Sequence, residues 1–183
     1  MKIGFVDRRF YDELPNINFQ WDTYSDITNL ILEYNSKFNY ENLFKALNDM
    51  NVDALEIRFY DHISAVELCF FLDRFKDSNL LSIEILIQYS TYQEIGETVD
   101  SFLQINPRIS KIFVSNCEER KDNLAFQDSV TIYFLSNNIN SCKYCGIVDK
   151  KYFNLNMTIF SESVSHNNCL NRKMAIDKGV VVY

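Results

Sequence analysis

The stretch Leu81-Ser82-Ile83-Glu84-Ile85-Leu86-Ile87-Gln88 decides the fold, because apolar residues alternate along it with serine, glutamate and glutamine. A period of two residues is typical of a β-strand. Four other segments also predict strands. Between the first four strands, the intervening segments carry apolar residues at helical spacing. The predicted strands are 27–34, 55–59, 81–88, 109–115 and 130–135, and the predicted helices are 40–50, about 63–76, and a third bearing Ile95, Val99, Phe102 and Leu103 on one face.

Repeated strand–helix units predict an α/β fold with a parallel sheet and right-handed crossovers. Four or five units are too few for a closed eight-fold barrel, so we expect a partial (β/α) barrel or an open parallel sheet. The second helix offers Ile63, Val66, Phe70 and Phe71 for its buried side. The helical rhythm stops near Asn140. We therefore divide the chain into a domain over residues 1–139 and a small Cys-containing β lobe over residues 140–183.

Composition narrows the classes of partner. The 183 residues carry a formal net charge of −7, which disfavours non-specific binding to nucleic acid or to an anionic membrane. No apolar run approaches the length of a membrane span, and the first residues lack the apolar core of a secretory signal. Four glycines cannot form the usual phosphate-binding loops. We expect a cytoplasmic protein that binds neither nucleic acid nor membrane.

Two predicted strands place charges where a fully covered parallel strand would be apolar. Glu56 and Arg58 alternate with apolar residues on one strand, and Glu84 does so on another. One interpretation is that this sheet face lines a polar cavity for an extended peptide or another ligand. The alternative is that the face meets solvent or a partner domain, and that its charges form surface ion pairs.

Two pairs of metal-ligating residue types lie near the C-terminus. Cys142 and Cys145 are separated by two residues, and so are His166 and Cys169. Two such pairs can converge on one tetrahedral zinc ion and make a closed, structural site. An iron–sulfur cluster is the less favoured occupant. The alternative is that these are ordinary residues, since unpaired cysteines are often simply buried.

The other cysteines fit no ligand pattern. Cys69 lies within a predicted helix beside two phenylalanines and is expected in the core. Cys117 lies at the end of a predicted strand, which is where the active sites of barrel folds lie. A rival hypothesis is therefore a non-radical enzyme that uses Cys117 or Glu84. A second rival is a structural or protein-interaction domain with no catalytic role.

Several short segments carry a resemblance to a known family. They are Ile27-Thr28-Asn29, Ile57-Arg58-Phe59-Tyr60, Cys145-Gly146-Ile147, Tyr152-Phe153-Asn154, and the run from Phe160 through Cys169 to Asp177. In these the chain resembles the SPASM-containing peptide maturases of grasp-with-spasm systems, where an ATP-grasp ligase and a small precursor peptide accompany the SPASM protein. The resemblance implies a fold like a radical SAM core and a role in modifying ribosomally made peptides.

The chain departs from that family in its cysteines. A radical SAM enzyme holds its iron–sulfur cluster with CxxxCxxC after the first strand, but here residues 33–40 contain no cysteine and the motif occurs nowhere. Cys169 and Gly179 match the start of the SPASM pattern, whose next cysteine would fall just beyond Tyr183. We therefore expect a fragment or a shortened relative that does not use S-adenosylmethionine.

These observations predict an accessory or maturase-like protein in ribosomal peptide modification. The resemblance implies a precursor peptide and an ATP-grasp ligase as its partners. Glu56, Arg58 and Glu84 would contact the peptide or a partner enzyme, and Cys142, Cys145, His166 and Cys169 would hold a structural metal ion. We predict no catalytic residue for this function.

Overall fold

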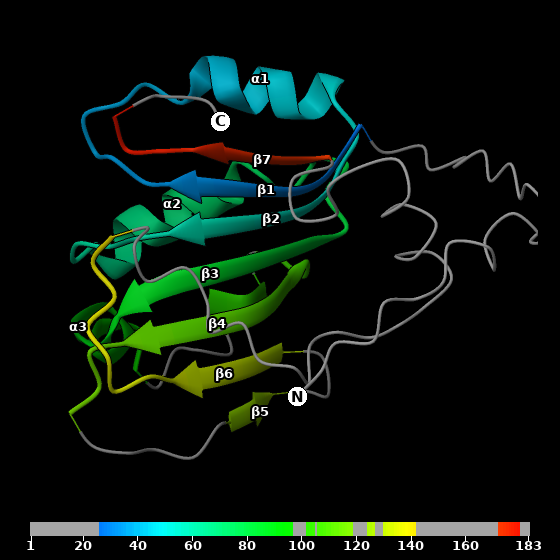
Figure 1. The fold of residues 1–183 in the computed structure, drawn as a ribbon. Coiled ribbons are helices and arrows are strands. Elements are labelled where there is room, and N and C mark those ends of the chain that lie inside the picture. The colour runs from blue at the N-terminus through cyan, green and yellow to red at the C-terminus, as the bar shows by residue number, and fades with distance from the viewer. Residues whose placement is uncertain are drawn as a thin grey trace, which may run out of the picture.

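The fold was analysed in a computed structural model, which describes residues 26–96, 102–104, 106–118, 124–126, 130–141 and 172–179. The described chain contains three labelled helices and seven strands, and residues 102–104 are also helical (Figure 1). In chain order they are β1 (Ile27–Glu33), α1 (Glu41–Asp49), β2 (Val52–Arg58), α2 (Ala65–Asp73), β3 (Ser82–Gln88), α3 (Tyr89–Ile95), β4 (Ile109–Ser115), β5 (Leu124–Phe126), β6 (Val130–Phe134) and β7 (Lys173–Ile176).

The seven strands form one open sheet in the order β5-β6-β4-β3-β2-β1-β7. All neighbours pair in parallel except β5, which runs antiparallel to β6. The predicted α/β class and largely parallel sheet are thus confirmed, together with the five predicted strands. Neither β5 nor β7 was predicted.

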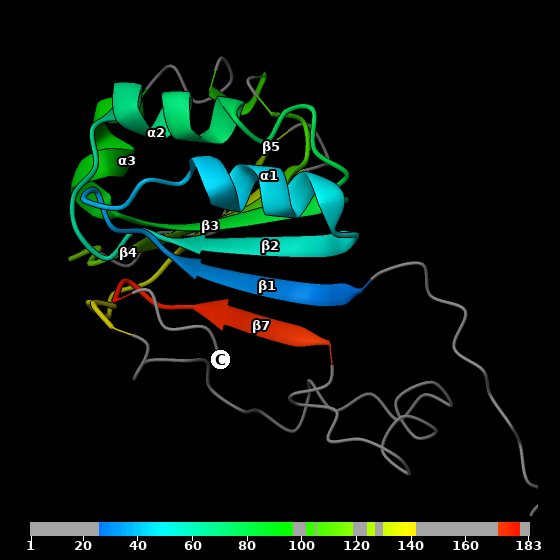
Figure 2. The same ribbon diagram turned by 90° about the horizontal axis from the view of Figure 1, so that it is seen from above.

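The helices α1, α2 and α3 all lie on one side of the sheet (Figure 2). The side chains that point toward them, such as Leu55, Ile57 and Ile85, are wholly buried. Because strand side chains alternate between faces, Glu56 and Arg58 point to the other side. We call that other side the uncovered face, since no helix in the described part of the chain lies on it, although Leu86 and Gln88 of this face are buried and Gln88 donates a hydrogen bond to the Ile139 carbonyl oxygen.

The α2 helix shows which apolar residues the core uses. Ser64 caps its first turn by accepting a hydrogen bond from the Glu67 N–H. Phe71 is buried, but Val66 and Phe70 are 81% and 72% exposed, so the prediction that they serve the buried side was wrong. They are four residues apart and share the outer face. The helix is apolar on nearly every side, so its sequence pattern could not select one face.

The α3 helix begins directly after β3, with Gln88 as its N-cap, and ends at Ile95. Gly96 follows with φ of +44°, a conformation that glycine adopts without steric cost. The helix therefore ends where the predicted apolar face was expected to begin. Of the residues predicted on that face, Phe102 is buried and Val99 lies outside the described residues.

The segment predicted as a separate C-terminal lobe contributes a strand to the main sheet. In β7, Met174 pairs with Leu30 and Ile176 pairs with Leu32 of β1. Met174 and Ile176 also pack against the hydrophobic core. Residues 142–171 of the predicted lobe lie outside the described residues.

No helix in the described ranges is long and apolar enough to cross a membrane.

Candidate functional site

Strand register brings the predicted polar residues together on the uncovered face. Glu56 of β2 lies beside Glu84 of β3, and Glu84 lies beside Lys111 of β4. Arg58 lies one step further along β2, on the same face. Glu56, Arg58, Glu84 and Lys111 are called the charged row below.

Opposite charges in the charged row contact one another. The Arg58 Nε donates a hydrogen bond to Glu56 Oε1 at 2.7 Å, and the Lys111 Nζ donates to Glu84 Oε1 at 2.5 Å. The Arg58 side chain is 13% exposed, whereas the side chains of Glu56 and Glu84 are 30% and 27% exposed. The face therefore presents two carboxylates, each held in place by a neighbouring cation.

An apolar row runs beside the charged row. Arg58 is in register with Leu86, Leu86 with Phe113, and Phe113 with Tyr133. The Phe113 and Tyr133 rings stack with centroids 5.2 Å apart. Phe113 and Tyr133 are partly exposed, whereas Leu86 is buried. Aromatic residues and arginine are enriched at protein-binding surfaces, although lysine and glutamate are not.

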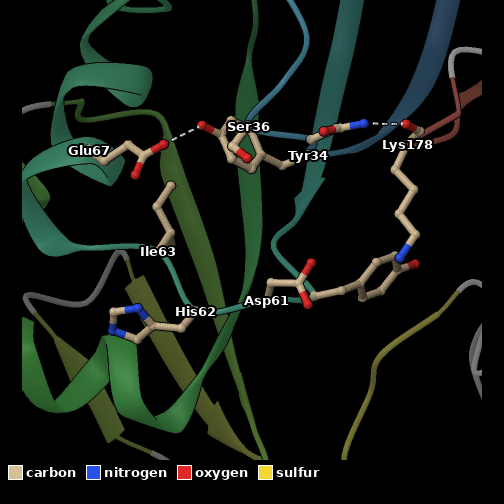
Figure 3. Close-up of a pocket in the computed structure, with 9 residues that line it drawn as sticks. Tyr34, Ser36, Asp61, His62, Ile63, Glu67 and Lys178 are labelled. Atoms are coloured by element: carbon tan, nitrogen blue, oxygen red, sulfur yellow. Dashed lines mark hydrogen bonds between the residues drawn. The ribbon is translucent and has the colours of Figure 1, made fainter.

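A cavity of about 270 Å³ lies at the carboxyl-terminal edge of the sheet, next to β1 (Figure 3). Its walls come from the loop after β1, the loop after β2 and the loop after β7. The lining residues are Tyr34, Asn35, Ser36, Tyr60, Asp61, His62, Ile63, Glu67 and Lys178. The cavity shares no residue with the charged row.

Hydrogen bonds between distant segments hold the walls of the cavity. The Asn35 Nδ2 donates to the Lys178 carbonyl oxygen at 2.7 Å, which joins the loops after β1 and β7. The Tyr60 hydroxyl donates to Glu33 Oε1 at 2.7 Å, and Glu33 is a buried residue at the end of β1. These bonds therefore link segments that line the cavity to each other and to β1.

Two phenols of the cavity have raised pKa values. Burial raises the pKa of Tyr34, and its 2.6 Å hydrogen bond to Glu67 raises it further. Burial likewise raises the pKa of Tyr60; a hydrogen bond with Arg58 opposes this effect, and the hydrogen bond to Glu33 adds to it. Both hydroxyls thus stay protonated at neutral pH and act as donors to carboxylates.

Charged groups of both signs line the cavity. Figure 3 shows Glu67 and Lys178 reaching it from opposite sides, with the Asp61 carboxylate in the space between them in this view. The Lys178 Nζ lies 5.8 Å from the centroid of the Tyr60 ring. Within the described part of the chain, Asp61 and Lys178 take part in no ion pair.

His62 is bound at the rim of the cavity. Its Nε2 lies 2.7 Å from Glu94 Oε1, and Glu94 Oε2 accepts a hydrogen bond from the Ala65 N–H at the start of α2. The Ala65 N–H and His62 hold the pKa of Glu94 below its usual value. This pair therefore ties α3 to the loop that forms one wall.

The residues predicted to hold a metal ion, Cys142, Cys145, His166 and Cys169, all lie outside the described residues. Among the described residues, no group of three or more His, Cys, Asp or Glu side chains could hold a metal ion.

The two remaining cysteines are covered to different degrees. Cys117 follows β4 as predicted, but it is only 1% exposed, unlike the accessible setting typical of a reactive thiol. Cys69 packs partly buried against the core, and burial raises the pKa of its thiol.

Sequence reasoning missed the cavity and its residues. The carboxyl ends of parallel strands are where ligands bind in open α/β sheets, so Tyr34 at the end of the strand predicted at 27–34, and Asp61 soon after the strand predicted at 55–59, could have been noticed. Lys178 could not have been noticed in this way, because β7 was not predicted. A scan of family models and searches of curated proteins and of solved structures found no match to this chain.

Proposed function

We propose that this chain is an accessory protein of ribosomal peptide modification, which binds a precursor peptide or its partner enzyme through the uncovered face and performs no radical chemistry. The observation that carries the proposal is the register of Glu56, Glu84 and Lys111 across three neighbouring strands. The 183 residues contain no CxxxCxxC motif, which is the reason for excluding a radical step. An ATP-grasp ligase is proposed as a partner only because the family resemblance implies one.

The charged row has a feature that stability alone does not favour. Like charges directly opposite each other on adjacent strands are destabilising, and Glu56 lies beside Glu84. Arg58 and Lys111 offset that repulsion by pairing with one carboxylate each. The result is a fixed pattern of charges next to the apolar row, in which the charges would select the polypeptide and the aromatic rings would supply contact area.

The test uses displayed peptides, because it needs no knowledge of the natural partner. A library of random linear peptides is selected on the full chain, and the affinities of the enriched peptides are measured by fluorescence polarisation. We expect Arg58→Glu to weaken binding by roughly tenfold or more, since truncating or reversing one charge in a desolvated contact costs about 2 kcal/mol or more.

A charge-swapped variant separates binding from folding. Glu84→Lys with Lys111→Glu keeps one ion pair but reverses the pattern of charges, so it should fold normally and lose the selected peptides. Lys45→Glu, on an exposed position of α1, should bind them like the parent chain. The proposal fails if no peptide is enriched, or if the selected peptides bind the charge-swapped variant unchanged.

A further inference from the structure

The cavity lies where the order of strands reverses. From β1 the chain proceeds through β2 and β3 to β4 across the sheet, whereas β7 joins β1 on its other side. In open parallel sheets, ligands bind outside the carboxyl ends of the strands at such a reversal. The loops after β1, β2 and β7 all contribute walls here. The fold thus places the cavity at the position where α/β sheets generally bind small molecules.

The charges of the cavity do not satisfy one another. Glu67 uses one oxygen to accept the Tyr34 hydrogen bond, and its other oxygen has no partner in the described part of the chain. Asp61 has no hydrogen-bond or ion-pair partner there either, although Lys178 lines the same cavity. Opposite charges that line one cavity without pairing leave room for a ligand that pairs with both.

The shape and walls limit the size of that ligand. A volume of about 270 Å³ lies below the roughly 300–1,000 Å³ of sites for drug-sized molecules. The Tyr60 ring and Ile63 supply apolar surface, and the Ser36 hydroxyl is exposed at the rim. The occupant is therefore small and mostly polar.

We infer that the cavity binds a small zwitterion of the free amino acid class, with its ammonium group facing the Asp61 and Glu67 carboxylates and its carboxylate facing the Lys178 ammonium. An anion such as phosphate fits less well, because the two carboxylates would repel it. The lining residues include two basic side chains, Lys178 and His62, and His62 is bound to Glu94. A divalent cation fits less well, because Lys178 would repel it.

Amide chemical shifts of the full chain test this inference. Two-dimensional ¹H–¹⁵N spectra are recorded while each of the twenty L-amino acids is added separately at millimolar concentration. At least one should shift the amides of Asn35, Asp61 and Lys178 in a saturable way. The N-acetyl and carboxamide derivatives of that same amino acid should bind at least tenfold more weakly, because each lacks one of the two charges.

Charge-removing variants locate the effect. Asp61→Asn and Lys178→Met should each weaken binding by about tenfold or more, while Asp77→Asn and Lys45→Met, at exposed positions away from the cavity, should not change it. Both cavity variants alter exposed side chains, and dispersed spectra verify that they fold. The inference is overturned if no amino acid shifts these amides, if the N-acetyl derivative binds as well as the free form, or if the cavity variants bind normally.

This site and the proposed peptide-binding face share no residue, but Arg58 of the charged row hydrogen-bonds to Tyr60 of the cavity, so variants at positions other than Arg58 separate the two sites. Loss of amino acid binding in Asp61→Asn would leave peptide binding unchanged, and charge reversal at Glu84 and Lys111 would leave amino acid binding unchanged. The two proposals can therefore fail separately.

Discussion

The neighbouring phenylalanines of α2 allow a sharp test of the packing. Phe71 is 6% exposed, and its ring centroid lies between 5.0 and 5.9 Å from those of Tyr34, Tyr40, Phe44, Phe59 and Phe75. Phe70 precedes it in the chain but is 72% exposed. The substitution Phe71→Ala would remove the centre of an aromatic cluster between the helices and the sheet.

The expected loss is large relative to total stability. Replacing a buried phenylalanine by alanine costs about 3–5 kcal/mol, because apolar transfer energy is lost and a cavity remains. Edge-to-face aromatic pairs add to this cost, and Phe71 makes such pairs with Tyr34, Tyr40 and Phe59. Domains are stable by only about 5–15 kcal/mol, so the variant should lose about a fifth or more of its stability.

Urea unfolding followed by circular dichroism measures this loss. With a denaturant slope of about 2 kcal/mol/M, a loss of about 4 kcal/mol lowers the unfolding midpoint by about 2 M. Phe70→Ala is the matched control, and it should change the free energy of unfolding by no more than about 0.5 kcal/mol. If the two variants lose equal stability, the orientation of α2 described above is wrong.

Three further predictions concern the cavity, the α2 cap and the metal ligands. Tyr60→Phe should lower the free energy of unfolding by about 1–3 kcal/mol, because the buried Glu33 carboxyl loses a donor. The lowered pKa of Glu94 adds stability that is present above its ordinary pKa of 4.5 and is lost as pH falls through the folded value, so the stability difference from Glu94→Gln should shrink below pH 4.5. Elemental analysis of anaerobically purified protein should find about one zinc per chain, lost in Cys142→Ser/Cys145→Ser.

Each of these predictions has a control. Tyr133→Phe removes a phenol hydroxyl from the uncovered face and should leave stability nearly unchanged; an equal loss would contradict the role of the Glu33 contact. If the difference in the free energy of unfolding between the parent chain and Glu94→Gln stays constant with pH, the contacts of Glu94 with Ala65 and His62 do not stabilise its charged form. Cys69→Ser should retain zinc, iron with acid-labile sulfide would indicate a cluster instead, and absence of both metals would refute the site.

Local patterns predicted most of the sheet. The alternation in 81–88 and the runs at 109–115 and 130–135 became β3, β4 and β6, because side-chain alternation is a property of each strand alone. The charges of Glu56, Arg58 and Glu84 were visible for the same reason. That they share a face with Lys111 required the register between strands, which depends on how the whole sheet assembles.

The cavity was decided by the tertiary structure alone. Its walls join Asn35 to Lys178, 143 positions apart in the chain, and no local pattern encodes which distant strand pairs beside β1. The choice of Phe71 over Phe70 for the core has the same origin, since α2 is apolar on most sides and only docking on the sheet selects a face. The sequence by itself determined the strands β1, β2, β3, β4 and β6, the apolar content and the positions of the charges, because these depend on near neighbours. Contacts between distant segments determined which face of the sheet the helices cover, that Phe71 rather than Phe70 is buried, and which charged residues line the cavity.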